Sequence, residues 1–308
     1  MKKDESTKKT AKTKTKVKTA AVAAKTTPVK KIESAQPVAE QSAGKNVAKP
    51  LTAARLQWLN KMLAVVYLVQ GLVLLVIAGR QSTPVTTYFL SKDVLQTEVS
   101  NGHTVLATAA RNIFDVRVAY VVVAALLVAA LVHALLATVL RKRYEHRLAV
   151  QGASPTRWMA SAAASGLLLL AVALLSGARD IGTLLLLLTL SGLAHAAWFV
   201  TEVHSRNKAT PSRLLYWLGV KAGLAIWVIV GWYALSATLF GGHVPAYLYG
   251  VYALAILGFV AMARGVLLVR RAQGEWRNYL YSERAFMVMN LVSMTTVSWL
   301  IFAGALRP

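Results

Sequence analysis

The chain has 308 residues, of which 56% are hydrophobic and only 15% charged, and its mean hydropathy is +0.50. The hydrophobic fraction and the mean hydropathy are higher, and the charged fraction is lower, than in a soluble globular chain of this length, so the composition predicts a membrane protein. Cysteine is absent, which excludes disulfides, thiolate metal sites and cysteine nucleophiles.

The net charge of +23 is unevenly distributed, because the first 50 residues hold 13 lysines against 4 acidic residues. This Lys-, Ala- and Thr-rich segment cannot bury enough apolar surface to offset the entropy lost on ordering. We therefore expect residues 1–50 to be a disordered basic cytoplasmic tail and residues 51–308 to form one membrane domain. The tail is either a solvated segment or a contact for anionic lipid or a cytoplasmic protein, and we expect no specific nucleic-acid binding.

Seven apolar runs are long enough to cross a bilayer, so we predict an all-α membrane protein with seven transmembrane helices. The predicted spans are 56–79, 118–140, 158–176, 181–201, 214–240, 246–269 and 285–306. The connections on one side of the bilayer carry 12 Lys or Arg residues, and those on the other side carry 6. Since basic connections stay inside, we predict a cytoplasmic N-terminus and an extracellular C-terminus at the plasma membrane.

The first outer connection is long and contains Asn101-Gly102 between Val- and Thr-rich runs. This dipeptide favours a two-residue turn between strands. We predict a small antiparallel β-hairpin outside the membrane, with an irregular loop as the alternative.

Ionisable groups at membrane depth usually mark function. The predicted spans contain no acidic residue in their interior, since Asp180 falls in a turn and Glu202 at the inner end of the fourth span. This absence argues against a proton pump or an ion-coupled transporter. Lys221 and Arg264 each lie within about 12 Å of a span end, and we expect them to extend to the interface, with a buried functional role as the alternative.

Two histidines lie in the predicted spans, His133 and His195. They could move protons or bind a metal, but neither has a second histidine or an acidic residue one turn away, so we interpret them as hydrogen-bonded core residues and expect no metal site. Tyr67 and Gln70 share one face of the first span. Catalytic and phosphate-binding motifs are missing, so we do not expect an enzyme.

Several ordered motifs resemble those of heliorhodopsins, relatives of the microbial rhodopsins with inverted topology. The motifs are YLVQG at 67–71, PVTTYFL at 84–90, IFDVRVAY at 113–120, RW at 157–158, LLSGARDI at 174–181 and GEWRNYLYSERAFMVMNLVSMTTVSWLIFAGAL at 274–306. The resemblance covers nearly all of 51–308. It implies a rhodopsin-like bundle with the N-terminus inside, and a dimer.

The sequence departs from this family at the two charged positions of its chemistry. Heliorhodopsins attach retinal as a Schiff base to a lysine in the seventh helix, in a stretch resembling VLSLVAKS. Here the stretch reads VMNLVSMT, which places Met294 at the lysine position, and Ala160 stands where the family has its counterion glutamate. A lone buried carboxylate would cost on the order of several kcal/mol, so losing both charges is favoured over losing one. Methionine is unbranched and roughly matches the lysine stem.

The resemblance also implies a remnant of the retinal pocket. Gln70 and His133 match polar residues of the family's internal cavity, whereas Tyr67 replaces a family histidine and Asn290 a family serine. Trp299 resembles a pocket aromatic residue, and ordinary packing is an equal alternative for it.

Together these residues predict a heliorhodopsin-like protein without a covalent retinal cofactor. We interpret it as a membrane interaction or signalling subunit in contact with the lipid bilayer, pairing with itself or with a related seven-helix protein. One alternative is a light-sensing receptor that holds retinal non-covalently or through Lys221. Another is a small-solute transporter, for which the sequence shows no internal repeat.

Overall fold

The computed structural model describes residues 52–101, 103–207 and 213–307. The predicted basic tail, residues 1–50, lies outside the described residues. Within the described part, helices dominate, and one two-stranded antiparallel sheet accompanies them.

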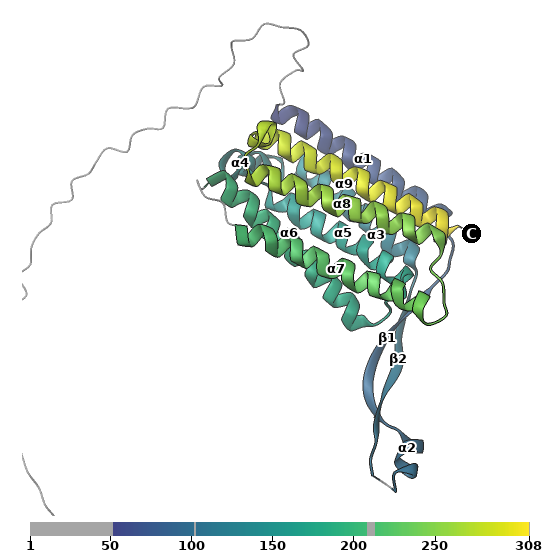
Figure 1. The fold of residues 1–308 in the computed structure, drawn as a ribbon. Coiled ribbons are helices and arrows are strands. Elements are labelled where there is room, and N and C mark those ends of the chain that lie inside the picture. The colour runs from purple at the N-terminus through teal and green to yellow at the C-terminus, as the bar shows by residue number, and fades with distance from the viewer. Residues whose placement is uncertain (1–51, 102, 208–212, 308) are drawn as a thin grey trace, which may run out of the picture. The chain divides into compact units, whose positions relative to one another are not determined.

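Seven helices are long and apolar enough to cross a membrane, which confirms the predicted spans. They are α1 (Ala53–Ile77), α3 (Val118–Ala137), α5 (Pro155–Leu175), α6 (Ile181–Asn207), α7 (Arg213–Leu239), α8 (Ala246–Arg270) and α9 (Tyr279–Ile301), which a π-helical turn, η2 (Phe302–Leu306), extends. The helices run side by side as a bundle (Figure 1). In this bundle α3 packs between α1 and α5, α6 lies between α5 and α7, and α8 packs on α9.

The interior and the outer surface of the bundle are both apolar. Val122, Leu126 and Leu187 are fully buried, whereas Val76, Val228 and Trp232 are more than 60% exposed. A soluble protein rarely exposes so much apolar surface, so these outer side chains form the face that meets lipid.

The predicted hairpin is present, but its turn differs from the prediction. Strands β1 (Thr83–Lys92) and β2 (Leu106–Val116) pair antiparallel, and the pairing ends at Lys92 and Leu106. The short helix α2 (Val94–Val99) fills the connection, because the Asp93 side chain accepts a hydrogen bond from the Gln96 N–H and caps it. Asn101 adopts a left-handed conformation (φ 56°) after α2, not in a two-residue turn between the strands.

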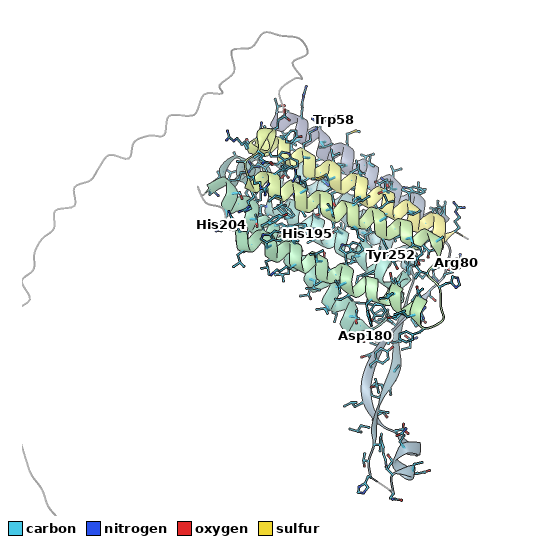
Figure 2. The ribbon with its side chains drawn as sticks, in the orientation of Figure 1. Trp58, Arg80, Asp180, His195, His204 and Tyr252 are labelled. Carbon is cyan, nitrogen blue, oxygen red and sulfur yellow. The ribbon has the colours of Figure 1, made fainter. Side chains whose placement is uncertain are left out.

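The hairpin extends from one end of the bundle (Figure 1). A backbone hydrogen bond attaches it there. The Thr86 N–H donates to the Arg179 carbonyl at 2.9 Å, in the turn between α5 and α6. In the same turn, the Asp180 carboxylate accepts from the Thr183 N–H at 2.8 Å and caps α6. Asp180 and Arg80 lie at this end of the bundle, and His204 lies at the opposite end (Figure 2).

At the end opposite the hairpin, the structure contains more helix than the sequence predicted. The connection after α3 includes helix α4 (Arg141–Gln151), which buries Tyr144 and Leu148. A 3-10 turn, η1 (Gly274–Arg277), leads into α9. In addition, α6 continues to Asn207 and α9 begins at Tyr279. The helices therefore extend beyond the predicted spans and include Glu202 and Glu283 near their ends, although the interiors of the predicted spans contain no acidic residue.

Candidate functional site

The central feature of the site is an apolar cavity around Met294 on α9. The Met294 side chain is only 2% exposed, and the cavity beside it encloses about 140 Å³. Helices α5 to α9 all contribute to its wall. The lining residues are Ser161, Ser165, Leu168, Leu169, Val172, Ser191, Ala194, His195, Trp198, Gly223, Ile226, Trp227, Ala255, Gly258, Phe259, Met262, Met289, Asn290, Ser293, Met294 and Val297. Lysine, arginine and acidic residues are all missing from this lining.

Glycines on α7 and α8 determine the shape of this cavity. A Cβ atom at Gly223 would collide with the Phe259 ring, and one at Gly258 would collide with the Ser293 side chain. The ring of Phe259 stacks on Trp198, with centroids 5.6 Å apart. Because glycine lets these side chains approach the helix backbone, the aromatic wall lies close to α7.

His195 is the main polar group in the cavity wall and lies on α6 between the two ends of the bundle (Figure 2). Its Nδ1 lies 2.8 Å from the Ser191 carbonyl oxygen, which can only accept, so Nδ1 carries the hydrogen. The Nε2 atom then accepts from the Ser161 hydroxyl at 3.3 Å. The predicted hydrogen-bonded core histidine is therefore confirmed for His195, and the sequence did not identify it as a cavity residue.

Ala160, at the counterion position, lines a second and smaller cavity of about 20 Å³. His133 and Arg157 also line this cavity, and Asn290 lines both cavities. Met294 and Ala160 thus face neighbouring spaces that share a wall. A space of this volume can hold a single water molecule but no larger group.

The other predicted pocket residues form two pairs outside the Met294 cavity. The His133 Nδ1–H donates to Asn60 Oδ1 at 2.8 Å, and the His133 ring stacks on Tyr67 at 5.8 Å between centroids. The Trp299 Nε1–H donates to Gln70 Oε1 at 3.1 Å. Both pairs join α1 to another helix, so they fix helix packing next to the cavity and do not form its wall.

Lys221, the proposed alternative attachment point, is exposed on the outer face of α7 and does not line the Met294 cavity. Arg264 is likewise exposed, on α8. The structure therefore gives no support to a covalent role for Lys221. Both side chains lie at the surface, as the expected extension to the interface requires.

A buried ion-pair cluster lies at the end of the bundle that holds α4, and sequence reasoning missed it. Arg157 Nε donates to Glu283 Oε2 at 2.7 Å, and Arg157 Nη2 donates to Glu202 Oε2 at 2.8 Å. All three residues are at most 5% exposed. The Trp158 Nε1–H adds a bond of 2.6 Å to the same Glu202 oxygen. The guanidinium of Arg157 also lies over the Trp158 ring, 4.6 Å from its centroid.

Local signals place Arg157 in this cluster. The Ser154 hydroxyl accepts from the Arg157 N–H and caps α5, and Pro155 occupies the first turn, where its missing N–H costs nothing. Arg157 therefore enters the bundle in the first turn of α5. The two acidic residues each flank an apolar run at the same end, and this shared position is the signal that could have revealed the cluster.

Two further groups stabilise the carboxylates. The Tyr144 hydroxyl donates to Glu283 Oε1 at 3.1 Å. Burial first, and then the Glu283 charge, raise the pKa of Tyr144 well above its usual value, so the phenol stays protonated and remains a donor. Arg206, one turn after Glu202, supplies a second positive charge that acts on both carboxylates.

The cluster and the Met294 cavity are separate along the helices. Glu283 precedes Met294 by eleven residues on α9, which corresponds to about 16 Å along the axis. Its carboxylate is also engaged by Arg157 and Tyr144. Glu202 is likewise bound to Arg157. The buried carboxylates in the described part of the chain are therefore not positioned to neutralise a cation at Met294.

Comparisons with known proteins agree with this architecture. The profile of the heliorhodopsin family matches residues 56–306. Among solved structures, the chain is similar to the light-driven proton pump LR (Mac) from Leptosphaeria maculans, with a TM-score of 0.54 and 14% identity over 84% of this chain and 98% of that one. At this identity the likeness shows a shared rhodopsin fold and no more. The comparison with curated proteins gave no match. Because the family profile spans the whole helical bundle, the chain belongs to the heliorhodopsin family.

Proposed function

We propose that this heliorhodopsin forms no retinal Schiff base and acts as an interaction or regulatory subunit in the membrane. One observation carries the proposal: the cavity at the attachment position of the family is lined by Met294 and contains no amine. A Schiff base requires a lysine amine. The residues of this cavity therefore do not fit covalently bound retinal, and we assign no photochemical step to the chain.

The electrostatics of the cavity support the same proposal. A protonated imine in a low-dielectric site needs a nearby carboxylate, and Ala160 offers none at the counterion position. The carboxylates of Glu202 and Glu283 are already bound to Arg157. Replacing a buried ion pair by apolar groups is often neutral or stabilising, so the double replacement is compatible with a stable bundle.

A retinal titration tests the proposal. Purified full-length protein is mixed with all-trans retinal, beside the double variant Met294→Lys with Ala160→Glu, and both are treated with borohydride. We expect no red-shifted, borohydride-sensitive absorption band from the natural sequence, because no cavity residue can form the imine. Such a band from the natural sequence would refute the proposal. A band from the variant alone would support a preserved pocket.

A non-covalent ligand is the second candidate, and the cavity itself favours it. Its wall is apolar with a few hydroxyls and His195, which is the usual character of a small-molecule site. Its volume of about 140 Å³ is below the roughly 300–1,000 Å³ of typical ligand pockets, so retinal would require side chains such as Trp198 and Phe259 to move. A rise in the melting temperature with retinal, retained after Lys221→Met, would favour this candidate.

We further propose that the N-terminus is cytoplasmic, that residues 1–50 contact anionic lipid or a protein partner, and that the chain pairs with itself or a relative. The bias of basic residues supports the orientation. Because the natural chain has no cysteine, single cysteines can report topology. Asn101→Cys is expected to react with an impermeant thiol reagent in intact cells, and Arg143→Cys only after lysis. The reverse pattern would contradict the orientation.

A further inference from the structure

A basic cavity lies on the outside of the bundle, between the start of α7 and the end of α8. It encloses about 630 Å³ and is separate from the Met294 cavity. Its lining residues are Arg213, Tyr216, Trp217, Leu267, Arg270 and Arg271. Three arginine side chains and two aromatic side chains therefore line one space. The start of α7 and the end of α8 lie at the end of the bundle opposite the hairpin (Figure 1).

The positive charge of this cavity is not neutralised by acidic side chains of the described structure. The ion pairs among the described residues involve Arg141 and Arg157 and none of the cavity arginines. The Nε atom of Arg270 is buried and has no hydrogen-bond partner in the described part of the chain. The guanidinium groups of Arg270 and Arg271 also lie close enough to the Tyr216 hydroxyl to act on it electrostatically. The site therefore has donors and positive charge available for an anion.

The basic side chains continue along the outer face of α7 into the membrane span. Arg213, Trp217 and Lys221 follow at intervals of four residues, and all three are exposed. Leu224 and Val228 extend the same stripe and are 51% and 71% exposed. Lys221 lies about 12 Å from the start of α7. One helix face thus begins with cations and continues with apolar side chains.

Helix α8 likewise has cations toward the same end of the bundle and apolar side chains farther into the span. Arg271, the residue directly after α8, and Arg264 within it lie seven residues apart and are exposed. Val260 and Leu257 continue that face with 52% and 62% exposure. A cation on a lipid-facing surface is costly unless its head reaches the polar interface and finds an anion there. A phospholipid supplies both parts: an anionic phosphate for the cations and acyl chains for the apolar stripes.

We propose that this cavity binds the phosphate headgroup of an anionic phospholipid. Basic pockets between membrane helices are suited to such headgroups, and Trp217 is a residue type that concentrates at the membrane interface. The positive end of the α7 dipole lies at Arg213 and adds to the attraction. We assign the site to a lipid and not to a soluble phosphate, because Lys221 and Arg264 continue the basic surface below the cavity, along the face that meets lipid.

The site is tested on the full-length protein in nanodiscs of phosphatidylcholine with phosphatidylglycerol. After release from the nanodiscs, native mass spectrometry counts the retained lipids of each kind. The site variant carries Arg213→Gln, Arg270→Gln and Arg271→Gln. The control variant carries Lys142→Gln, Arg143→Gln and Arg147→Gln on α4, which removes the same charge near the same end of the bundle. Both variants keep residues 1–50, so the contribution of the tail is unchanged.

We expect the natural protein to retain phosphatidylglycerol in preference to phosphatidylcholine, the site variant to lose this preference by roughly tenfold or more, and the control variant to keep it. A second variant, Lys221→Gln with Arg264→Gln, is expected to give a smaller loss and covers the case in which the triple variant fails to fold. An equal loss in the control, or no preference in the natural protein, would overturn the site. Displacement of the lipid by millimolar inorganic phosphate would overturn the assignment to a lipid.

Discussion

The Arg157 cluster and the Met294 cavity both use residues of helices α5, α6 and α9, but the cluster contains buried charges and the cavity lining contains no Lys, Arg, Asp or Glu. At the end of the bundle, Arg157 binds two carboxylates, and all three groups are buried. At the cavity, His195 is the titratable side chain of the lining. The described residues therefore contain buried charges at the Arg157 cluster, where each charge has an opposite partner, and not at the Met294 cavity, where no partner is available.

Of three substitutions that test this comparison, removing Arg157 should cause the largest loss of stability. Arg157→Met leaves Glu202 and Glu283 buried without their partner, and we expect a loss of about 3–5 kcal/mol of stability. The measurement is thermal or denaturant-induced unfolding in detergent. Arg141→Met is the matched control, because the Arg141 side chain is 55% exposed and its pair with Glu145 should contribute at most about 1 kcal/mol. Equal losses in both variants would contradict the special role of the cluster.

A side chain at Gly223 should destabilise the bundle at the cavity and not at the Arg157 cluster. Gly223→Ala places a methyl group where the Phe259 ring lies, so we expect a loss of about 1–3 kcal/mol and a displaced aromatic wall. Gly231→Ala on the same helix is the control, since its added methyl group meets nothing within 4 Å. That change should be neutral or stabilising by up to about 1 kcal/mol. Near-UV circular dichroism and unfolding measurements report the two effects.

The smallest expected effect is at the pair that joins α1 to α9. Trp299→Phe removes the donor to Gln70 and keeps most of the aromatic volume, so we expect a loss of about 0.5–1.5 kcal/mol. Trp232→Phe is the control, because Trp232 is 61% exposed on the lipid-facing surface. If both variants unfold at the same temperature, the bond between Trp299 and Gln70 does not stabilise the bundle.

The sequence was sufficient to predict the seven spans, because an apolar run of about 20 residues has few other stable structures. The Val- and Thr-rich runs were sufficient to predict the hairpin, but the Asn101-Gly102 dipeptide did not predict its turn correctly. The Asp93 cap starts a short helix before Asn101 is reached, and such competition between local signals is difficult to read from one dipeptide.

The candidate site was only partly predictable. The resemblance identified Met294 and Ala160, and the structure places them in adjacent cavities. The cluster around Arg157 was missed because Glu202 and Glu283 lie just beyond the apolar runs, and hydropathy ends a span before the helix ends. The lateral order of the helices, which brings His195 into the cavity wall, depends on packing that no single helix encodes.

The most direct test of the account is the intact mass of the natural protein after incubation with retinal and reduction with borohydride, followed by denaturation. We expect no retinyl group on any residue inside the bundle, since no cavity residue presents an amine. The double variant Met294→Lys with Ala160→Glu serves as the positive control for the procedure. One retinyl group retained on the natural polypeptide, mapped by peptide sequencing to a residue inside the bundle, would contradict the account.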